Sequence, residues 1–189
     1  MIVSAEHNIN SNNYKLFEFN DIHSHVPGRD RVLSVDFTTD AIPSDPEQHF
    51  TLGVHPWNAE NHVDWNEFEK ALDNPAIVGI GEAGLDTLRG PDAGIQLEVF
   101  KKQIELAQKH KLPLIIHSVK SNHEILRLKK LYDSPTPWII HGFRGNLQQA
   151  RQLIASGIHL SLGTKANSEV AALSSPFIHR ESDEEQIKQ

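Results

Sequence analysis

The sequence predicts an α/β fold, namely a small (β/α)8 TIM barrel in which the first two crossover helices are short or missing. Eight short apolar segments recur along the chain, and most are separated by segments with helical spacing of apolar residues. Such alternation indicates a parallel sheet with right-handed crossovers, and eight units close naturally into a barrel. The 189 residues fall short of the roughly 250 that are typical of this fold. The missing length is expected in the first two connections and at the end of the chain.

Each predicted strand is a run of apolar and β-branched residues between turn residues. The eight runs are Lys15–Asp21, Arg31–Phe37, Phe50–His55, Ala76–Glu82, Leu112–His117, Pro137–His141, Ile158–Leu162 and Pro176–Glu181. The fourth run is the clearest buried strand. Its glycines at positions 79 and 81 would allow close approach of a neighbouring backbone. The segment that follows, GLDTLRGPDAG, is predicted to be a loop.

The predicted helices have apolar residues recurring on one side. They are Val63–Leu72, Gln96–His110, Asn122–Tyr132, Asn146–Ala155 and Asn167–Leu173, and Asp183–Lys188 would begin a last helix. Between the first and second strands little remains beyond VPGRD, and the next connection contains the proline-rich AIPSDPEQ. Neither connection favours a standard helix.

Composition predicts a polar N-terminal leader over residues 1–14 and a single barrel domain over residues 15–189. With 38% hydrophobic and 23% charged residues, the chain is expected to be soluble and monomeric. It has no cysteine, no signal-peptide pattern and no apolar run of membrane-spanning length, so we expect a cytoplasmic protein without a membrane partner. The net charge of −7 argues against gripping long nucleic acid by the general surface. Bound cations would still recruit a phosphate locally.

Histidines and carboxylates recur where predicted strands end. They are His23, His25, His55, Glu82, His117, His141, Glu181 and Asp183. A single histidine at the end of a buried strand is more often a packing residue, but in a barrel all these ends meet at the face where active sites lie. Imidazoles and carboxylates without thiolates favour a divalent metal site of the hydrolytic kind, and Zn, Mn, Mg, Ni or Fe would suit it.

The central position of Glu82 makes it the candidate carboxylate that bridges two cations. Two cations about 3.5–4 Å apart are the usual device for phosphoester hydrolysis by an activated water. The sequence therefore predicts two bound divalent metal ions and a hydrolase that acts on a phosphoester.

The motifs DIHSH, GVHPW, GEAGLD, LPLIIHS and HGFRG, with a helix carrying Gln96, Phe100 and Gln103 after the third, occur in this order over residues 15–183. This pattern resembles the TatD-type metal-dependent hydrolases, (β/α)8 members of the amidohydrolase superfamily that are generally described as divalent-metal deoxyribonucleases. The resemblance implies metal ligation by the residues His23, His25, Glu82, His117 and His141. It also implies a substrate-contacting role for His55, a supporting or substrate-facing role for Asp86, and a phosphate contact by Arg144.

One motif departs from the family pattern. The family ends its eighth strand with an ETD-like triplet whose aspartate is a ligand and the catalytic acid/base, whereas this chain has FIHRESDEE. The best alignment places Glu181 on that aspartate, with Asp183 as the alternative and His179 as a further candidate. We therefore expect Glu82, Glu181 and His55 to be catalytic, and Glu181 also to ligate metal.

Two other functions remain open at this point. The same ligands can polarise a carbonyl, so an amidohydrolase-like enzyme acting on a small ester or amide is one alternative. The altered eighth-strand motif and the short chain also suit a degenerate metal-binding protein without turnover. The tryptophans Trp57, Trp65 and Trp138 are expected to pack in the core rather than to stack on bases.

Overall fold

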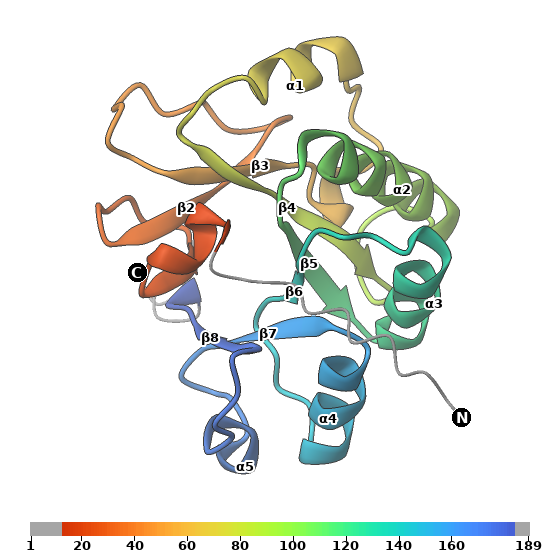
Figure 1. Cartoon of the computed structure of the whole chain (residues 1–189). Coiled ribbons are helices and arrows are strands. Elements are labelled where there is room, and N and C mark those ends of the chain that lie inside the picture. The colour runs from red at the N-terminus through yellow and green to blue at the C-terminus, as the bar shows by residue number, and fades with distance from the viewer. Residues whose placement is uncertain (1–12, 184–189) are drawn as a thin grey trace.

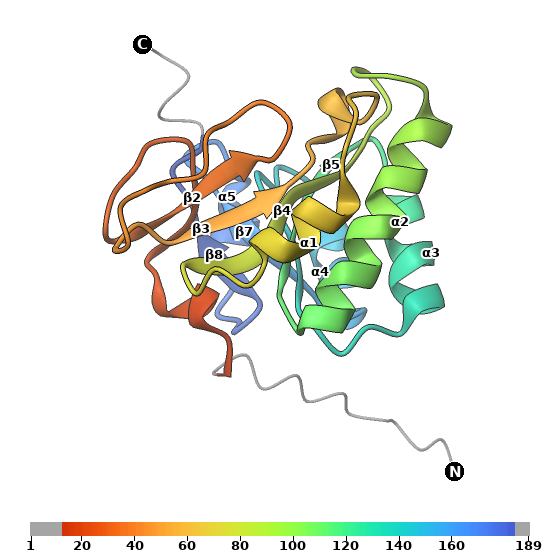
Figure 2. The same cartoon turned by 90° about the horizontal axis from the view of Figure 1, so that it is seen from above.

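The computed structural model describes residues 13–183, in which eight parallel strands form one sheet that curves into a nearly closed barrel (Figures 1 and 2). Consecutive strands pair in sequence order. The strands are β1 Asp21–Ser24, β2 Arg31–Asp36, β3 Phe50–Gly53, β4 Ile77–Asp86, β5 Leu114–Val119, β6 Trp138–Ile140, β7 Ile158–Leu162 and β8 Ile178–Arg180. The predicted fold class is confirmed.

The helices lie around the outside of the strands (Figure 1). They are α1 Trp65–Ala71, α2 Ala93–His110, α3 Asn122–Tyr132, α4 Leu147–Ala155 and α5 Ser168–Ala171, with short 3-10 helices η2 Lys15–Glu18 and η3 Pro56–Asn58. The connections β1–β2 and β2–β3, both fully described, contain no helix, as the sequence predicted. None of the helices in residues 13–183 has both the length and the apolar character that crossing a bilayer requires.

The first strand, predicted over Lys15–Asp21, was placed wrongly, because only Asp21 of these residues lies in β1. Residues 15–18 form η2, and β1 begins only at Asp21. Leu16 is fully buried, and the next residue, Phe17, stacks on His179 with ring centroids 4.5 Å apart. Consecutive side chains of a strand point to opposite faces, so a strand cannot direct both of these residues inward. A helical turn can, and η2 packs both side chains inward instead.

The apolar side chains form two clusters, one inside the barrel and one outside it. The outer cluster includes Phe100 and Ile104 of α2 and lies between the sheet and the helices. The inner cluster takes one residue from each of five strands together with Leu16 of η2. Its strand members are Ile22, Val32, Val78, Ile115 and Ile139. Bulky branched residues of this kind fill the interior of such barrels, so the barrel is a packed core rather than a pore.

β4 is longer than predicted, because the first residues of the expected loop continue the strand to Asp86. Gly81 and Gly84 have φ of 146° and 135°, a backbone region that favours glycine. A Cβ on Gly84 would lie 2.2 Å from the carbonyl oxygen of His117, so the two backbones pass too closely for any side chain. This close approach brings Glu82 and Asp86, which lie on the same face of β4, to the side chain of His117.

The barrel closes through side chains at the seam between β8 and β1. No ladder joins these two strands in the described part of the chain, but the backbone N–H and hydroxyl of Ser182 both donate to the carboxylate of Asp21. This contact directs the chain after β8 back over the first strand. The last predicted helix, apart from Asp183, and residues 1–12 of the predicted leader lie outside the described residues.

Candidate metal centre

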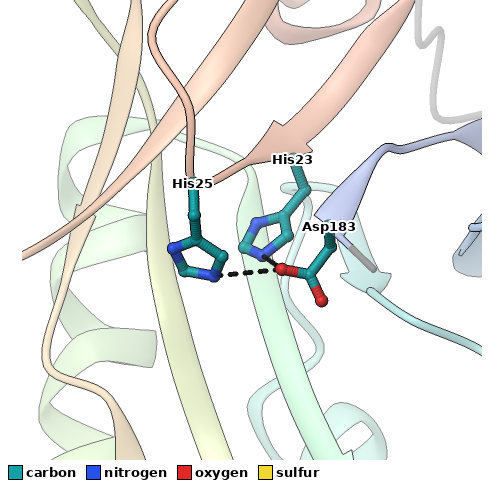
Figure 3. A group of neighbouring side chains, drawn as sticks. All are labelled: His23, His25 and Asp183. Atoms are coloured by element: carbon teal, nitrogen blue, oxygen red, sulfur yellow. Dashed lines mark ion pairs between the residues drawn. The ribbon is translucent and has the colours of Figure 1, made fainter. Parts of the chain in front are cut away.

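His23 and His25, here called the HxH pair, lie at the end of the first strand and face the carboxylate of Asp183. His23 is in β1 and His25 follows it by two residues, so both imidazoles project to the same side. Their Nε2 atoms are 3.7 Å and 3.0 Å from Oδ1 of Asp183 (Figure 3). His23 is buried, whereas the side chain of His25 is about half exposed, so the group opens to solvent on one side.

Glu82 lies between this pair and the histidines of the later strands. Its Oε1 is 3.0 Å from Nε2 of His55, 2.6 Å from Nδ1 of His117 and 2.7 Å from Nε2 of His141. Its other oxygen, Oε2, faces the HxH pair, with Nε2 of His23 at 3.5 Å. Glu82 is only 5% exposed. A carboxylate with one oxygen toward each group of histidines can bridge two cations.

Both carboxylates after β8 reach the cluster, but from different sides. Oε1 of Glu181 lies 4.0 Å from Nδ1 of His141, and the Glu181 side chain is fully buried. Asp183 contacts the HxH pair instead. The structure therefore assigns the two candidates for the eighth-strand carboxylate to different neighbours.

The side chains present fit divalent cations. Four overlapping groups of three residues each hold their ligand atoms within 4.8 Å of one another, and together they comprise His23, His25, His55, Glu82, His117, His141, Glu181 and Asp183. Among the described residues, both ring nitrogens of His23, Nδ1 of His141 and both oxygens of Glu181 are buried without a hydrogen-bond partner. Each such atom costs about 1–3 kcal/mol unless something satisfies it. A cation would satisfy these lone pairs, because imidazole and carboxylate are ligands that divalent transition metals accept.

Electrostatics tie the cluster together. Burial disfavours charge on Glu82, but the neighbouring imidazoles, first that of His141, hold its pKa well below the usual range. Burial likewise disfavours the imidazolium of His141, but Glu82 outweighs it and raises the pKa of His141 to about 9. Metal ligands must be deprotonated, so a cation that binds here competes with these protons and releases them.

The hydrogen bonds of His55 determine which of its nitrogens carries the proton. Its Nδ1 accepts the backbone N–H of Trp57 at 3.1 Å, so Nε2 is protonated and donates to Oε1 of Glu82. A protonated Nε2 has no lone pair for a metal. Oδ2 of Asp36 also accepts the backbone N–H of His55 at 2.8 Å, which holds the residue after β3 in place. His55 is therefore arranged as a proton donor beside the candidate metal ligands.

Asp86 contacts His117 at Nε2, the ring nitrogen that does not face Glu82. Its Oδ2 lies 3.2 Å from Nε2 of His117 and accepts the indole N–H of Trp57 at 2.7 Å. Its Oδ1 accepts the backbone N–H groups of Leu88 and Arg89. Burial raises the pKa of Asp86, but these hydrogen bonds outweigh it and the pKa is lowered. Both oxygens are engaged, so Asp86 fixes the orientation of the His117 ring through Nε2, an arrangement that carboxylates commonly have beside metal-binding histidines.

Two buried glutamines of α2, to which the sequence analysis gave no role, position the strand ends. Gln96 accepts the backbone N–H of Asp86 and donates to its carbonyl oxygen. Gln103 forms the same pair of bonds with Val54, directly before His55. The two amides are seven residues apart and therefore share one helix face. Buried amides at this spacing on an otherwise apolar face were the available signal.

Three further expectations have different outcomes. Trp138 is buried in the core and Trp65 packs against it, as expected, but the packing prediction was wrong for Trp57, which is 41% exposed. Its indole N–H reaches Asp86, which keeps the ring at the surface. His179 lies outside the four groups of candidate metal ligands. It faces the barrel interior, where its Nε2 lies 2.9 Å from Nδ1 of His159. Arg144 is exposed in the β6–α4 connection.

The family described as TatD related DNase matches residues 36–184. The chain belongs to the TatD-related DNase family. The match begins at the last residue of β2 and covers β3 through β8 and the two carboxylates after β8, so it includes every cluster residue except His23 and His25. The family prediction made from the motifs is thereby confirmed.

Individual relatives support the assignment. The chain is 35% identical over 118 residues to the uncharacterized metal-dependent hydrolase YjjV of Escherichia coli, covering 59% of this chain and 45% of the relative. It is 32% identical over 119 residues to the 3'-5' ssDNA/RNA exonuclease TatD of Cronobacter turicensis, covering 59% and 44%. The crystal structure of Escherichia coli YJJV, a TatD homologue, superposes with a TM-score of 0.70 at 26% identity, covering 81% of this TatD-related chain and 66% of the other. The chain spans about half the length of the curated relatives it matches.

Proposed function

We propose that this chain is a divalent-metal-dependent phosphodiesterase of the nuclease type that uses two cations. The observation that supports it most directly is the position of Glu82, with one oxygen toward the HxH pair and the other toward His117 and His141. Zn, Mn, Mg, Ni and Fe all accept such ligands. Bound cations would supply charge stabilisation at a phosphoryl oxygen and a water of lowered pKa.

The protein's own groups have separate roles in this proposal. His55 donates a proton or a hydrogen bond from Nε2, and Asp86 keeps His117 in its ligating orientation. Asp183, beside the HxH pair, is the carboxylate that accepts and returns a proton, and Glu181 completes the ligands around His141. Arg144, exposed at the same end of the barrel, contacts the phosphate of the substrate. All these groups come from one chain, which supports activity of a single copy.

Metal removal and reconstitution test the proposal. The protein would be stripped with a chelator, reloaded with each candidate ion, and assayed on single-stranded DNA, duplex DNA, a small phosphodiester and small esters and amides. We expect phosphodiester cleavage that disappears on chelation and returns with metal, and DNA binding that weakens as salt is added. Hydrolysis of esters or amides alone would favour the amidohydrolase-like alternative. Metal binding without turnover would favour the degenerate metal-binding protein. Absence of metal binding would overturn the proposed phosphodiesterase and both alternatives.

A further inference from the structure

An exposed aromatic ring and an exposed cation stack on one another beside the metal ligands. The guanidinium carbon of Arg89 lies 5.2 Å from the ring centroid of Trp57. Trp57 is 41% exposed and Arg89 is also exposed. We propose that the Trp57–Arg89 stack is a nucleobase subsite, which binds one unpaired base of the substrate next to the phosphodiester that is cleaved. This inference rests on the proposed function and names the residues that would select its substrate.

The indole is fixed at this place rather than loosely attached to the surface. Its N–H donates to Oδ2 of Asp86 at 2.7 Å, and the backbone N–H of Trp57 donates to Nδ1 of His55. The ring lies edge-on to His55 and His117, with centroids 4.7 Å and 5.8 Å away. The polar edge of the indole is thus satisfied inside the site while much of the ring faces solvent. A ring held in one orientation loses little conformational freedom when a base stacks on it.

Arg89 is positioned by its backbone, which leaves its side chain available. Its backbone N–H donates to Asp86 and its carbonyl oxygen accepts from the amide of Gln96. Within residues 13–183, no carboxylate lies within 4 Å of the guanidinium nitrogens, and the guanidinium lies over the ring of Trp57. A stacked guanidinium keeps its N–H donors at its edge, where they can reach a phosphate. In a chain of net charge −7, this cation attracts an anion to the mouth of the barrel.

The three neighbouring features correspond to the parts of a nucleotide. The indole ring would bind the base, and the Arg89 cation and the proposed metal centre would bind phosphates. Bases of a duplex already stack on each other, so a base must be unpaired to reach this ring. The subsite therefore selects single strands and frayed ends. Every base has a π-face, so we expect little preference among the four bases.

The first experiment measures binding of hydrolysis-resistant phosphorothioate trinucleotides to the metal-loaded protein by fluorescence anisotropy. One trinucleotide carries all its bases, and its partner is abasic at one terminus, with each terminus tested in turn. We expect the wild type to prefer the base-bearing ligand about 10- to 100-fold at one terminus, the range found for stacking on an aromatic side chain. Equal binding of base-bearing and abasic ligands at both termini would overturn the subsite.

Two variants separate stacking from a structural role of Trp57. Trp57→Leu and Trp57→Phe both lose the indole N–H bond to Asp86, but only Trp57→Phe keeps an aromatic face. We expect the preference for the base to disappear in Trp57→Leu and to persist, reduced, in Trp57→Phe. If the two variants lose the preference equally, Trp57 is merely structural and the inference fails. Arg89→Gln is expected to weaken binding severalfold, whereas the matched control Arg151→Gln, an exposed arginine of α4, should not.

Steady-state kinetics on a cleavable oligonucleotide complete the test, because a binding subsite changes KM more than kcat when it acts equally in the ground and transition states. Failure of the subsite and failure of the proposed function are distinguishable. Cleavage of phosphodiesters without discrimination between base-bearing and abasic ligands would remove the subsite alone. Discriminating binding without cleavage under any metal would remove the proposed function and keep the subsite.

Discussion

Buried and partly buried histidines occur in two regions of this barrel, and their surroundings give them opposite pKa shifts. At the mouth, His141 faces Glu82, and its pKa is raised to about 9 although burial opposes the charge. In the barrel interior, His159 of β7 faces His179 of β8, and Phe17 stacks on both. Burial and then the neighbouring imidazole lower the pKa of His159 to about 3, and burial lowers that of His179 to about 4.

The contrast shows that the residue type does not decide the role. Imidazoles beside carboxylates form a set of ligands that can hold protons or cations. Imidazoles among aromatic rings remain neutral and act as packing residues that share a hydrogen bond. The histidines of both regions lie in apolar strands or directly after them. The difference in their pKa therefore comes from the side chain that each one faces across the barrel.

The largest expected effect comes from removing the carboxylate at the mouth. Glu82→Gln should lower kcat at least about 100-fold, the scale of losing one electrostatic group in a catalytic site, and should reduce the bound metal per chain. Activity assays and elemental analysis of the purified protein measure both. His159→Gln is the matched control, because it alters a buried histidine pair that lies away from the ligands. If His159→Gln lost metal as readily as Glu82→Gln, the distinction between the two regions would fail.

The next effect compares the two carboxylates after β8. Asp183 lies 3.0 Å from Nε2 of His25, whereas Glu181 approaches only His141, at 4.0 Å. We expect Asp183→Asn to lower kcat about 100-fold and Glu181→Gln about 10-fold, with the larger loss at the residue that exchanges the proton. Measuring kcat at saturating metal concentration distinguishes the loss of a proton-exchanging group from weakened metal binding. The reverse order would return the acid/base role to Glu181, as the alignment first indicated.

The smallest expected effect is on stability against pH. His159 has a folded-state pKa of about 3, below its unfolded value of about 6.5. The unfolded chain therefore binds more protons between these values, so stability is lost as the pH falls below about 6.5. At pH 5 this one histidine should cost about 2 kcal/mol relative to neutral pH. His141 has the opposite sign in the metal-free protein, because its raised pKa gives stability that is present below about pH 6.5 and lost as the pH rises through about 9.

Urea unfolding of the metal-free protein at pH 5 and pH 7 measures the loss of stability at acid pH. The difference in free energy of unfolding between the two pH values should be smaller for His159→Gln than for the wild type, since the other titrating groups are common to both. Equal differences for the two proteins would show that the interior pair does not titrate as its surroundings indicate.

Much of the fold could be predicted because it depends on neighbours in sequence. Apolar runs such as Ala76–Glu82 and the helical spacing of α2 are local patterns, and the alternation of strands and helices limits the topology. The error at η2 arose because Phe17 packs against His159 and His179, residues far along the chain. An alternating pattern of phenylalanines describes a strand equally well when those partners are unknown.

The site shows the same division. The histidines at strand ends could be predicted to lie together because parallel strands all end at one face, and the structure brings them into one cluster. The exposure of Trp57 depended on a hydrogen bond to Asp86, which in turn required β4 to run four residues past Glu82. The separate neighbours of Glu181 and Asp183 depended on the seam, where Ser182 binds Asp21 across 161 positions of sequence.

The sequence by itself determined the order of the strands, the kinds of ligand atoms and the family. The tertiary structure alone decided which of those atoms meet, which histidines are charged and which tryptophan reaches solvent. The reason is physical: secondary structure follows from side chains a few positions apart, whereas ligation and pKa follow from distances of a few ångströms. His141 and Glu82 are 59 positions apart in the chain and 2.7 Å apart in space. Only the closed barrel brings them together.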